Sequence, residues 1–150
     1  MQTTNDDAVK LLNSLIETTL DSANGYEEAA KSVDDAQLKS MFADRSRKRG
    51  EITRTLQQEV RSFGGEPQTH QSALGKAHNA FVDVKKALTG GSAKAVVDEV
   101  ERGEDFIKAK FEKAVRADEL PPAARATVNR ALDSIREDHD EISALKHSMH

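Results

Sequence analysis

The sequence predicts an all-α protein, namely a four-helix bundle of two antiparallel hairpins joined by a shorter crossover helix. Four long stretches carry apolar residues at helical spacing, and no stretch alternates between apolar and polar residues as a strand would. Only three prolines and eight glycines occur in 150 residues, which suits long amphipathic helices. We expect a chain of this length to form one domain, residues 1–150, with its own core.

The first predicted hairpin consists of helices over residues 6–33 and 35–63. Asn5 is placed to cap the first helix, and Asp34 to end it and cap the second, with Gln37 completing a capping box. Because almost no residues separate the two helices, they must lie side by side in opposite directions. Their apolar positions include Leu12, Leu15, Ile16, Tyr26, Val33, Leu38, Phe42, Ile52, Leu56 and Val60.

The second helix is expected to stop at the sequence GGEP, residues 64–67. Glycine adopts the left-handed conformation that closes many helices, and Pro67 cannot continue one. A shorter crossover helix is then expected over residues 72–88. Its apolar face consists of Leu74, Ala77, His78, Phe81, Val84 and Leu88.

The second predicted hairpin consists of helices over residues 93–117 and 121–147. Pro121 and Pro122 suit the first turn of the last helix, where a missing backbone N–H leaves no hydrogen bond unmade. The inner faces are marked by Val97, Val100, Ile107, Phe111 and Val115 on one helix, and by Val128, Leu132, Ile135 and Ile142 on the other.

Charged or polar residues interrupt three of these four apolar faces at mid-height. Arg45 and Arg49 fall on the face of the second helix, Glu104 on that of the next long helix, and His139 on that of the last. Counting residues back from the two hairpin turns places these groups near one level. We therefore predict that Arg45, Arg49, Glu104 and His139 converge in a buried polar layer near the centre of the bundle.

One interpretation of this layer is a buried ion-pair network. A buried guanidinium needs a partner, because removing its charge from water is otherwise too costly. Glu104 is expected to neutralise Arg45 and Arg49. Candidate flanking partners are Glu27, Glu101 and Tyr26.

Two ligand-binding interpretations stay open beside the ion-pair network. Glu and His on facing helices are the ligands of di-metal carboxylate bundles, but the Glu-x-x-His motif of those bundles is absent from this sequence. His139 with Glu104 and Glu101 would instead form a mononuclear or degenerate site for Zn, Mn or Fe. Alternatively, Arg45 and Arg49 would hold a small anion. No further cofactor is expected.

The composition and the motifs of the sequence argue against several classes of function. The sequence has no cysteine, no phosphate loop and no nucleophile motif, so enzymatic activity has little support. A net charge of −4 without a long basic run argues against nucleic-acid binding. No apolar run approaches the length of a membrane span, and the polar N-terminus does not resemble a signal peptide. We therefore expect a cytoplasmic protein that does not bind membranes.

Segments spread over nearly the whole chain occur together in one known family. They are LNSLIE (12–17) with Asp21 and Gly25-Tyr26, VRSFGGEP (60–67), HNAFVDVK (78–85) with ALTG (87–90), ERGED (101–105) and LPP (120–122). Taken together, they resemble a bacterial ferritin-like four-helix-bundle family of unknown function. This resemblance implies a small standalone ferritin-like bundle. It carries no assigned reaction, although relatives of this kind are linked to bacterial stress physiology.

The sequence leaves three functions open. The favoured one is a non-catalytic bundle that acts through protein association, as a homodimer or with another protein. The second is a metal-binding redox protein that uses His139 and Glu104. The third is a carrier of a small anion or ligand that uses Arg45 and Arg49.

Overall fold

The structure is a computed structural model that describes residues 2–69 and 93–149. It contains the helices α1 (Gln2–Ser32), α2 (Ala36–Ser62), α5 (Ala93–Val115) and α6 (Pro122–Ser148), and these residues include no strand. The predicted all-α four-helix bundle is confirmed. None of the four helices is long and apolar enough to cross a membrane.

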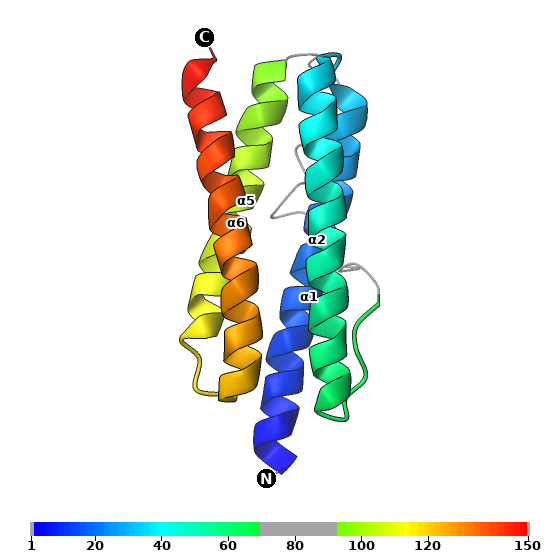
Figure 1. Cartoon of the computed structure of the whole chain (residues 1–150), viewed down its shortest axis with the longest axis vertical. Coiled ribbons are helices and arrows are strands. Elements are labelled where there is room, and N and C mark those ends of the chain that lie inside the picture. Colours follow the sequence, from blue (N-terminus) through cyan, green and yellow to red (C-terminus); the bar gives the residue numbers. More distant parts are fainter. Residues whose placement is uncertain (1, 70–92, 150) are drawn as a thin grey trace.

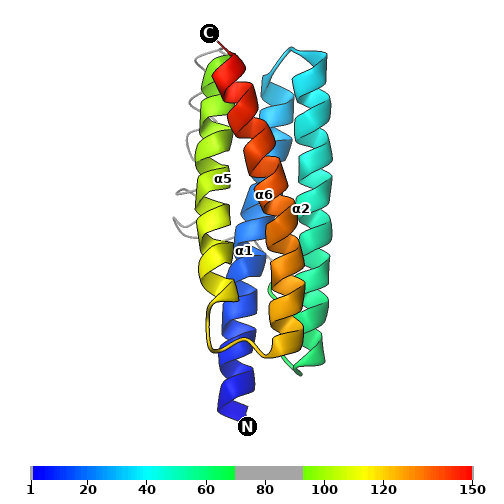
Figure 2. The same ribbon diagram turned by 60° about the vertical axis from the view of Figure 1, so that its left-hand side comes forward.

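The helices are arranged as two antiparallel hairpins lying against each other. α1 pairs with α2 and α5 with α6, and the bundle closes where α1 packs beside α5 and α2 beside α6. α2 ends at the end of the bundle opposite to the start of α5, so these two helices run in the same direction (Figures 1 and 2). A bundle with one long crossover connection has this arrangement. The predicted crossover helix over residues 72–88 lies outside the described residues.

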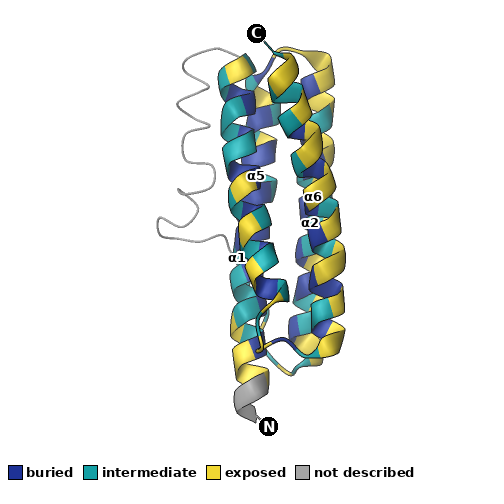
Figure 3. Cartoon of the chain, turned by 90° about the vertical axis from the view of Figure 1, so that its left-hand side faces the viewer, coloured by how far each residue is buried: buried dark blue, intermediate teal, exposed yellow. Residues whose placement is uncertain are grey.

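Two helices, α1 and α5, each contain a series of buried residues at alternating steps of three and four. Figure 3 shows that the buried positions form faces turned towards the interior. This 3.5-residue spacing is typical of helices that pack as in a coiled coil. The positions are Ala8, Leu12, Leu15, Thr19, Ser22, Tyr26, Ala29 and Val33 on α1, and Val97, Val100, Glu104, Ile107, Phe111 and Ala114 on α5. The buried residues of α6 are Ala124, Thr127, Val128, Leu132, Ile135, Asp138 and Ile142, and they follow this spacing only in part, with a step of three from Ile135 to Asp138 and of four from there to Ile142.

α2 departs from this spacing near its middle. Its buried residues proceed from Arg45 to Arg49, Thr53 and Leu56, so two steps of four follow each other. Such a step, called a stutter, locally unwinds a helix relative to its neighbours. Ile52, which regular spacing would bury, is therefore left partly exposed.

Several helix ends differ from the predicted ones. α1 begins at Gln2 instead of residue 6, so Asn5 lies within the helix and does not cap it. Neither proline nor glycine precedes Asn5, so nothing in that segment stops the helix from extending. α5 ends at Val115 because the N–H groups of Arg116 and Ala117 bond to carbonyls three residues back, as in a 3₁₀ turn. α6 spans Pro122–Ser148, one residue later at each end than predicted.

Asp35, and not Asp34, caps α2. Its carboxylate accepts a hydrogen bond from the backbone N–H of Leu38 at 3.0 Å, which satisfies one of the free donors of the first turn. The helix starts at Ala36, so the residue three positions after the cap is Leu38 and no capping box with Gln37 forms.

The predicted stop after α2 takes the form of a Schellman motif. Gly64 adopts a left-handed φ of 78°. The N–H of Gly64 bonds to the carbonyl of Arg61 at 2.9 Å, and the N–H of Gly65 bonds to that of Val60 at 3.0 Å. This pairing satisfies carbonyls that the last turn of α2 would otherwise leave without partners.

The apolar core is divided into two clusters by a polar layer. One cluster, nearer the α1 N-terminus, is built around Leu12, Leu15, Leu56, Val60, Ile107, Phe111, Leu132 and Ile135. The other, nearer the α1–α2 turn, is built around Tyr26, Val33, Phe42, Val97, Val100 and Ile142. The buried polar residues at the boundary include Thr19, Ser22, Arg45, Arg49, Thr53, Glu104 and Asp138.

The two environments of Gly64 and Gly50 predict opposite results for the same substitution. Gly64→Ala should destabilise the protein by about 1 kcal/mol, because an L-residue resists the left-handed φ. Gly50→Ala should stabilise it by up to about 1 kcal/mol, since its Cβ would meet only the Arg54 side chain, at 3.6 Å, inside a helix. Urea unfolding of both variants measures the difference. If both substitutions changed the free energy of unfolding in the same direction, the two assigned backbone conformations would be contradicted.

Candidate functional site

Arg49 is the centre of the polar layer and contacts residues from all three other helices. Its guanidinium pairs with both carboxylate oxygens of Glu104 on α5, with Nη1–Oε1 at 2.6 Å and Nη2–Oε2 at 2.8 Å. Nη1 also donates to Ser22 Oγ on α1 at 2.9 Å, and Nη2 to Asp138 Oδ2 on α6 at 3.1 Å. Arg49 and Glu104 are both 0 % exposed. One guanidinium therefore joins the four helices at a single level.

The charges of this layer keep Arg49 protonated despite its burial. Burial by itself lowers the pKa of Arg49, but the negative charge of Glu104, its hydrogen bonds and the charge of Asp138 raise the pKa above its ordinary value. The bidentate geometry also holds both oxygens of Glu104. The Arg49 guanidinium therefore stays protonated in the folded protein.

Asp138 is the second negative centre and lies among three cations of α2. Its Oδ1 is 2.8 Å from Lys48 Nζ and 3.6 Å from Arg45 Nε, while Oδ2 bonds to Arg49. Arg45 also pairs with Glu141 on α6, with Nη2–Oε1 at 2.7 Å. These contacts connect α2 with α6. Three cations and three carboxylates thus balance one another.

Tyr26 lies beneath the two guanidiniums. The centre of its ring is 5.4 Å from Arg49 Cζ and 5.9 Å from Arg45 Cζ, within the range of a cation–π interaction. The ring also stacks at a tilt on Phe42, with centroids 5.9 Å apart. Burial, followed by the negative charge of Glu104, raises the pKa of Tyr26 well above its ordinary value. The phenol is therefore neutral in the folded protein.

A pair of hydroxyls extends the layer by one turn. Thr19 Oγ1 and Thr53 Oγ1 lie 2.7 Å apart between α1 and α2. Each oxygen also lies near a carbonyl of its own helix, Thr19 at 3.0 Å from that of Ile16 and Thr53 at 2.9 Å from that of Arg49. Because each hydroxyl has one proton, one threonine donates to the other, which donates to the carbonyl of its own helix. Thr53 occupies the buried position at which α2 changes its spacing, so a polar contact accompanies the stutter.

His139 was predicted in the buried layer, and the structure contradicts this. Its ring lies at the surface between α5 and α6, with Nε2 2.6 Å from Asp105 Oδ1 and Nδ1 3.4 Å from Asp140 Oδ1. Asp138 occupies the inward position instead. On a straight helix with 3.6 residues per turn, Asp138 and His139 lie on opposite sides of the midpoint between Ile135 and Ile142 at equal angles. The observed steps of three from Ile135 to Asp138 and of four from there to Ile142 select Asp138.

The two predicted flanking carboxylates also lie away from the arginines. Glu27 is exposed and pairs with Lys31 on its own helix at 3.3 Å. Glu101 pairs with Lys146 on α6 at 2.8 Å. Partial burial raises the pKa of Glu101, but the hydrogen bond and the charge of Lys146, together with a hydrogen bond from Ser143 and the charge of His139, lower it below its ordinary value. Neither Glu27 nor Glu101 occupies one of the buried, inward-facing positions of its helix. The carboxylates beside Arg45 are instead Asp138 and Glu141 of α6.

This arrangement gives little support to the metal and anion interpretations. Glu104 is engaged by Arg49, while His139 is engaged by Asp105, so the proposed ligands do not share a site. Among the described residues, no group of three His, Cys, Asp or Glu side chains is placed to hold a metal ion. Arg45 and Arg49 are likewise occupied by carboxylates of the chain.

Comparison with known families identifies the chain at this point. Residues 7–117 match the family described as "Domain of unknown function (DUF2383)". The chain belongs to this family. The match includes Arg45, Arg49 and Glu104 but ends before α6, which contributes Asp138. None of the curated proteins matches the chain. The family description names neither an activity nor a fold, so the ferritin-like relationship stays a prediction.

A double-mutant cycle tests the central pair. Glu104→Met should destabilise the protein by about 3–5 kcal/mol, because it leaves Arg49 buried with less negative charge. Adding Arg49→Met should recover part of this loss, since both charges are then removed together. Urea unfolding measures the free energies.

Arg136→Met provides the matched control for this cycle. Arg136 forms a half-exposed ion pair with Glu112, so its loss should cost below about 1 kcal/mol. Additive losses in the double variant Arg49→Met/Glu104→Met would contradict the assigned pairing.

Tyr26 should make stability fall at alkaline pH. A phenol whose folded pKa is raised stabilises the fold fully below the unfolded pKa of 10.0, and this stabilisation is lost as pH rises from there towards the folded pKa. Because Tyr26 is the single tyrosine, the ultraviolet absorbance of tyrosinate reports on it alone. As the pH is raised, tyrosinate absorbance should appear together with the loss of helical circular dichroism. In Tyr26→Phe the free energy of unfolding should depend less on pH above pH 10.0 than it does in the wild-type protein. Ionisation at an ordinary pKa in the folded protein would refute this.

Proposed function

We propose that this protein is a non-catalytic ferritin-like bundle that acts through protein association. The observation that carries the proposal is the ion pair of Arg49 and Glu104 at the level where di-metal carboxylate bundles hold their ions. A guanidinium does not ligate a cation and stays protonated. The centre of the bundle is therefore suited to holding four helices together, and the function is to be sought on the surface.

The surface best suited to association is a groove between α1 and α5. It encloses about 690 Å³ and is lined by Leu11, Phe106, Ala109, Lys110, Lys113 and Glu119, with others. Phe106 is partly exposed, and Lys110 Nζ lies 6.0 Å from the centre of its ring. An apolar floor with a charged rim is the composition of many protein interfaces.

A second copy of this chain is the proposed occupant. The same end of the molecule carries cations on α5, at Lys110 and Lys113, and carboxylates at Asp6, Asp7 and Glu119. A two-fold axis would place the cations of one copy opposite the carboxylates of the other, as an interface made of one repeated surface requires. Because this surface is complementary in charge to a second copy of itself, it favours a homodimer over an unrelated partner.

Paired substitutions of exposed alanines test this proposal. Ala109→Glu introduces a charge into the groove and should raise the dimer dissociation constant at least about tenfold, because each dimer would bury the new carboxylate twice. Ala144→Glu, at an exposed position of α6, should leave it unchanged. Sedimentation velocity over a dilution series measures both.

Two results would contradict the proposal. One is a wild-type protein that sediments as a monomer at every concentration. The other is stoichiometric Zn, Mn or Fe that dialysed wild-type protein retains and His139→Ala does not, since this would restore the metal-binding interpretation. Elemental analysis of the two dialysed proteins separates these cases.

A further inference from the structure

We propose that a second groove, between α2 and α6, binds a small amphipathic carboxylate. Its carboxylate would bond to Arg130 at one end, and its hydrocarbon part would lie over Ile52 and Ala131. Nothing in this inference depends on association through the α1–α5 groove, because the two grooves lie on different pairs of helices.

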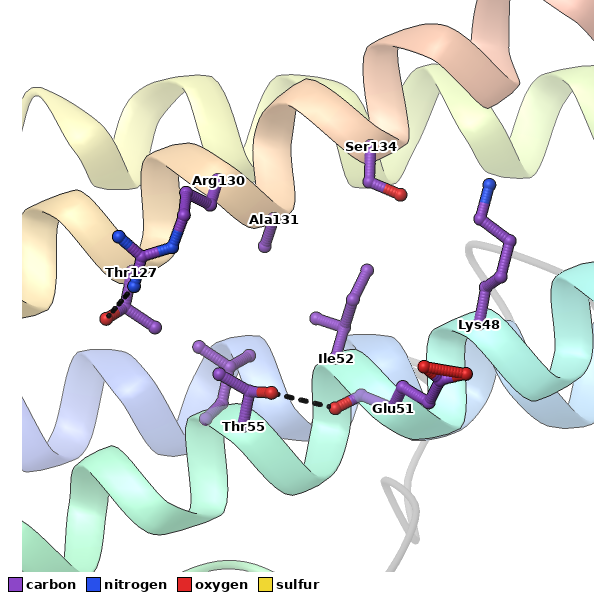
Figure 4. Close-up of a pocket in the computed structure, with 9 residues that line it drawn as sticks. Lys48, Glu51, Ile52, Thr55, Thr127, Arg130, Ala131 and Ser134 are labelled. Carbon is purple, nitrogen blue, oxygen red and sulfur yellow. Dashed lines mark hydrogen bonds between the residues drawn. The ribbon is translucent and has the colours of Figure 1, made fainter.

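The groove lies where the two hairpins meet. It encloses about 260 Å³, and in Figure 4 the side chains of Ile52 and Ala131 face each other across it. Leu56, which is 0 % exposed, also lines it, so the floor reaches the apolar core. Arg130 and Thr127 lie at one end and Lys48 at the other (Figure 4).

The stutter of α2 explains why an apolar groove opens here. Regular spacing would bury Ile52, but the step from Arg49 to Thr53 turns Thr53 inward and leaves Ile52 partly exposed. The facing position on α6 is Ala131, whose small side chain cannot fill the space. A partly exposed isoleucine opposite an alanine thus forms an apolar slot at the surface.

Arg130 supplies the positive end of this slot. Its Nη2 donates to Thr127 Oγ1 at 3.3 Å, and no ion pair joins it to a carboxylate of the described residues. Glu51 also lines the groove, at the end where Lys48 lies (Figure 4), and it pairs with Arg47. Glu59 accepts a hydrogen bond from Thr127 at 2.9 Å. A guanidinium presents paired donors that match a carboxylate.

Lys48, at the other end, already has an anionic partner. Lys48 lines the groove, and its ammonium is held by Asp138 Oδ1 at 2.8 Å, which balances its charge. Arg130 at the opposite end would therefore determine the charge of the head group, by repelling a cation and attracting an anion. The volume is somewhat below that of sites for drug-sized ligands, which begin near about 300 Å³. A carboxylic acid with a short alkyl chain or one aromatic ring matches both conditions.

Octanoate is the probe, with 1-octanol and octylamine as neutral and cationic controls of the same chain length. Methyl NMR titration of the wild-type protein should show saturable shifts of Ile52 and Ala131 with octanoate. 1-Octanol should bind at least about tenfold more weakly, because it lacks the charged hydrogen bonds to Arg130. Octylamine should cause no saturable shift at these methyl groups.

Two arginine variants complete the experiment. Arg130→Gln should weaken octanoate binding about tenfold, while Arg136→Gln, whose arginine pairs with Glu112 outside the groove, should bind as wild type does. The proposal is overturned if octanoate causes no saturable shift, if 1-octanol binds equally well, or if Arg130→Gln has no effect. Shifts confined to the methyl groups of Leu11 would assign the binding to the α1–α5 groove and overturn it as well. Repeating the titration in Ala109→Glu keeps the result independent of dimer formation.

Discussion

The ion pair between Arg49 and Glu104 constrains the rest of the bundle. Both side chains are fully buried, and an unpaired charge at this depth would be prohibitively costly. Two of the remaining N–H groups of Arg49 donate to acceptors at the same level, Nη1 to Ser22 and Nη2 to Asp138, while its Nε–H has no hydrogen-bond partner among the described residues. Asp138 in turn attracts Arg45 and Lys48. The charge of one residue on α2 thus determines which side chains the other three helices can place at that height.

Such a layer contributes specificity more than stability. A buried ion pair often stabilises a protein no better than apolar side chains of equal volume, whereas losing one partner is costly. The apolar clusters on either side are rich in Leu, Ile and Val, and apolar side chains of similar volume can replace one another at modest cost. A slip of one heptad would leave Arg49 without Glu104. The layer therefore penalises other registers, which is the best-attested use of buried polar residues in helical bundles.

The sequence was sufficient for the fold, for the inward placement of Arg45, Arg49 and Glu104, and for the glycine stop after α2. It was insufficient where two neighbouring residues compete for one inward position. Asp138 and His139 lie at equal angles on either side of the same apolar face, so helical spacing alone does not separate them. The cap at Asp35 instead of Asp34 is a similar shift by one position. Ser22 lies three residues after Thr19 and four before Tyr26, in the heptad series of α1. Applying a 3.5-residue spacing to the sequence would therefore have predicted its inward position.

The stutter of α2 connects the charge layer with the groove proposed as a ligand site. Arg49 must point towards Glu104, and Thr53 must reach Thr19, so two inward positions stand four residues apart. Ile52 is displaced outward as a consequence, and α2 meets α6 across an open slot. Lys48 belongs to both features, because it binds Asp138 and also lines the slot. The hydrocarbon part of a ligand bound through Arg130 would cover Ile52 and Ala131 and would leave the Lys48 ammonium on Asp138.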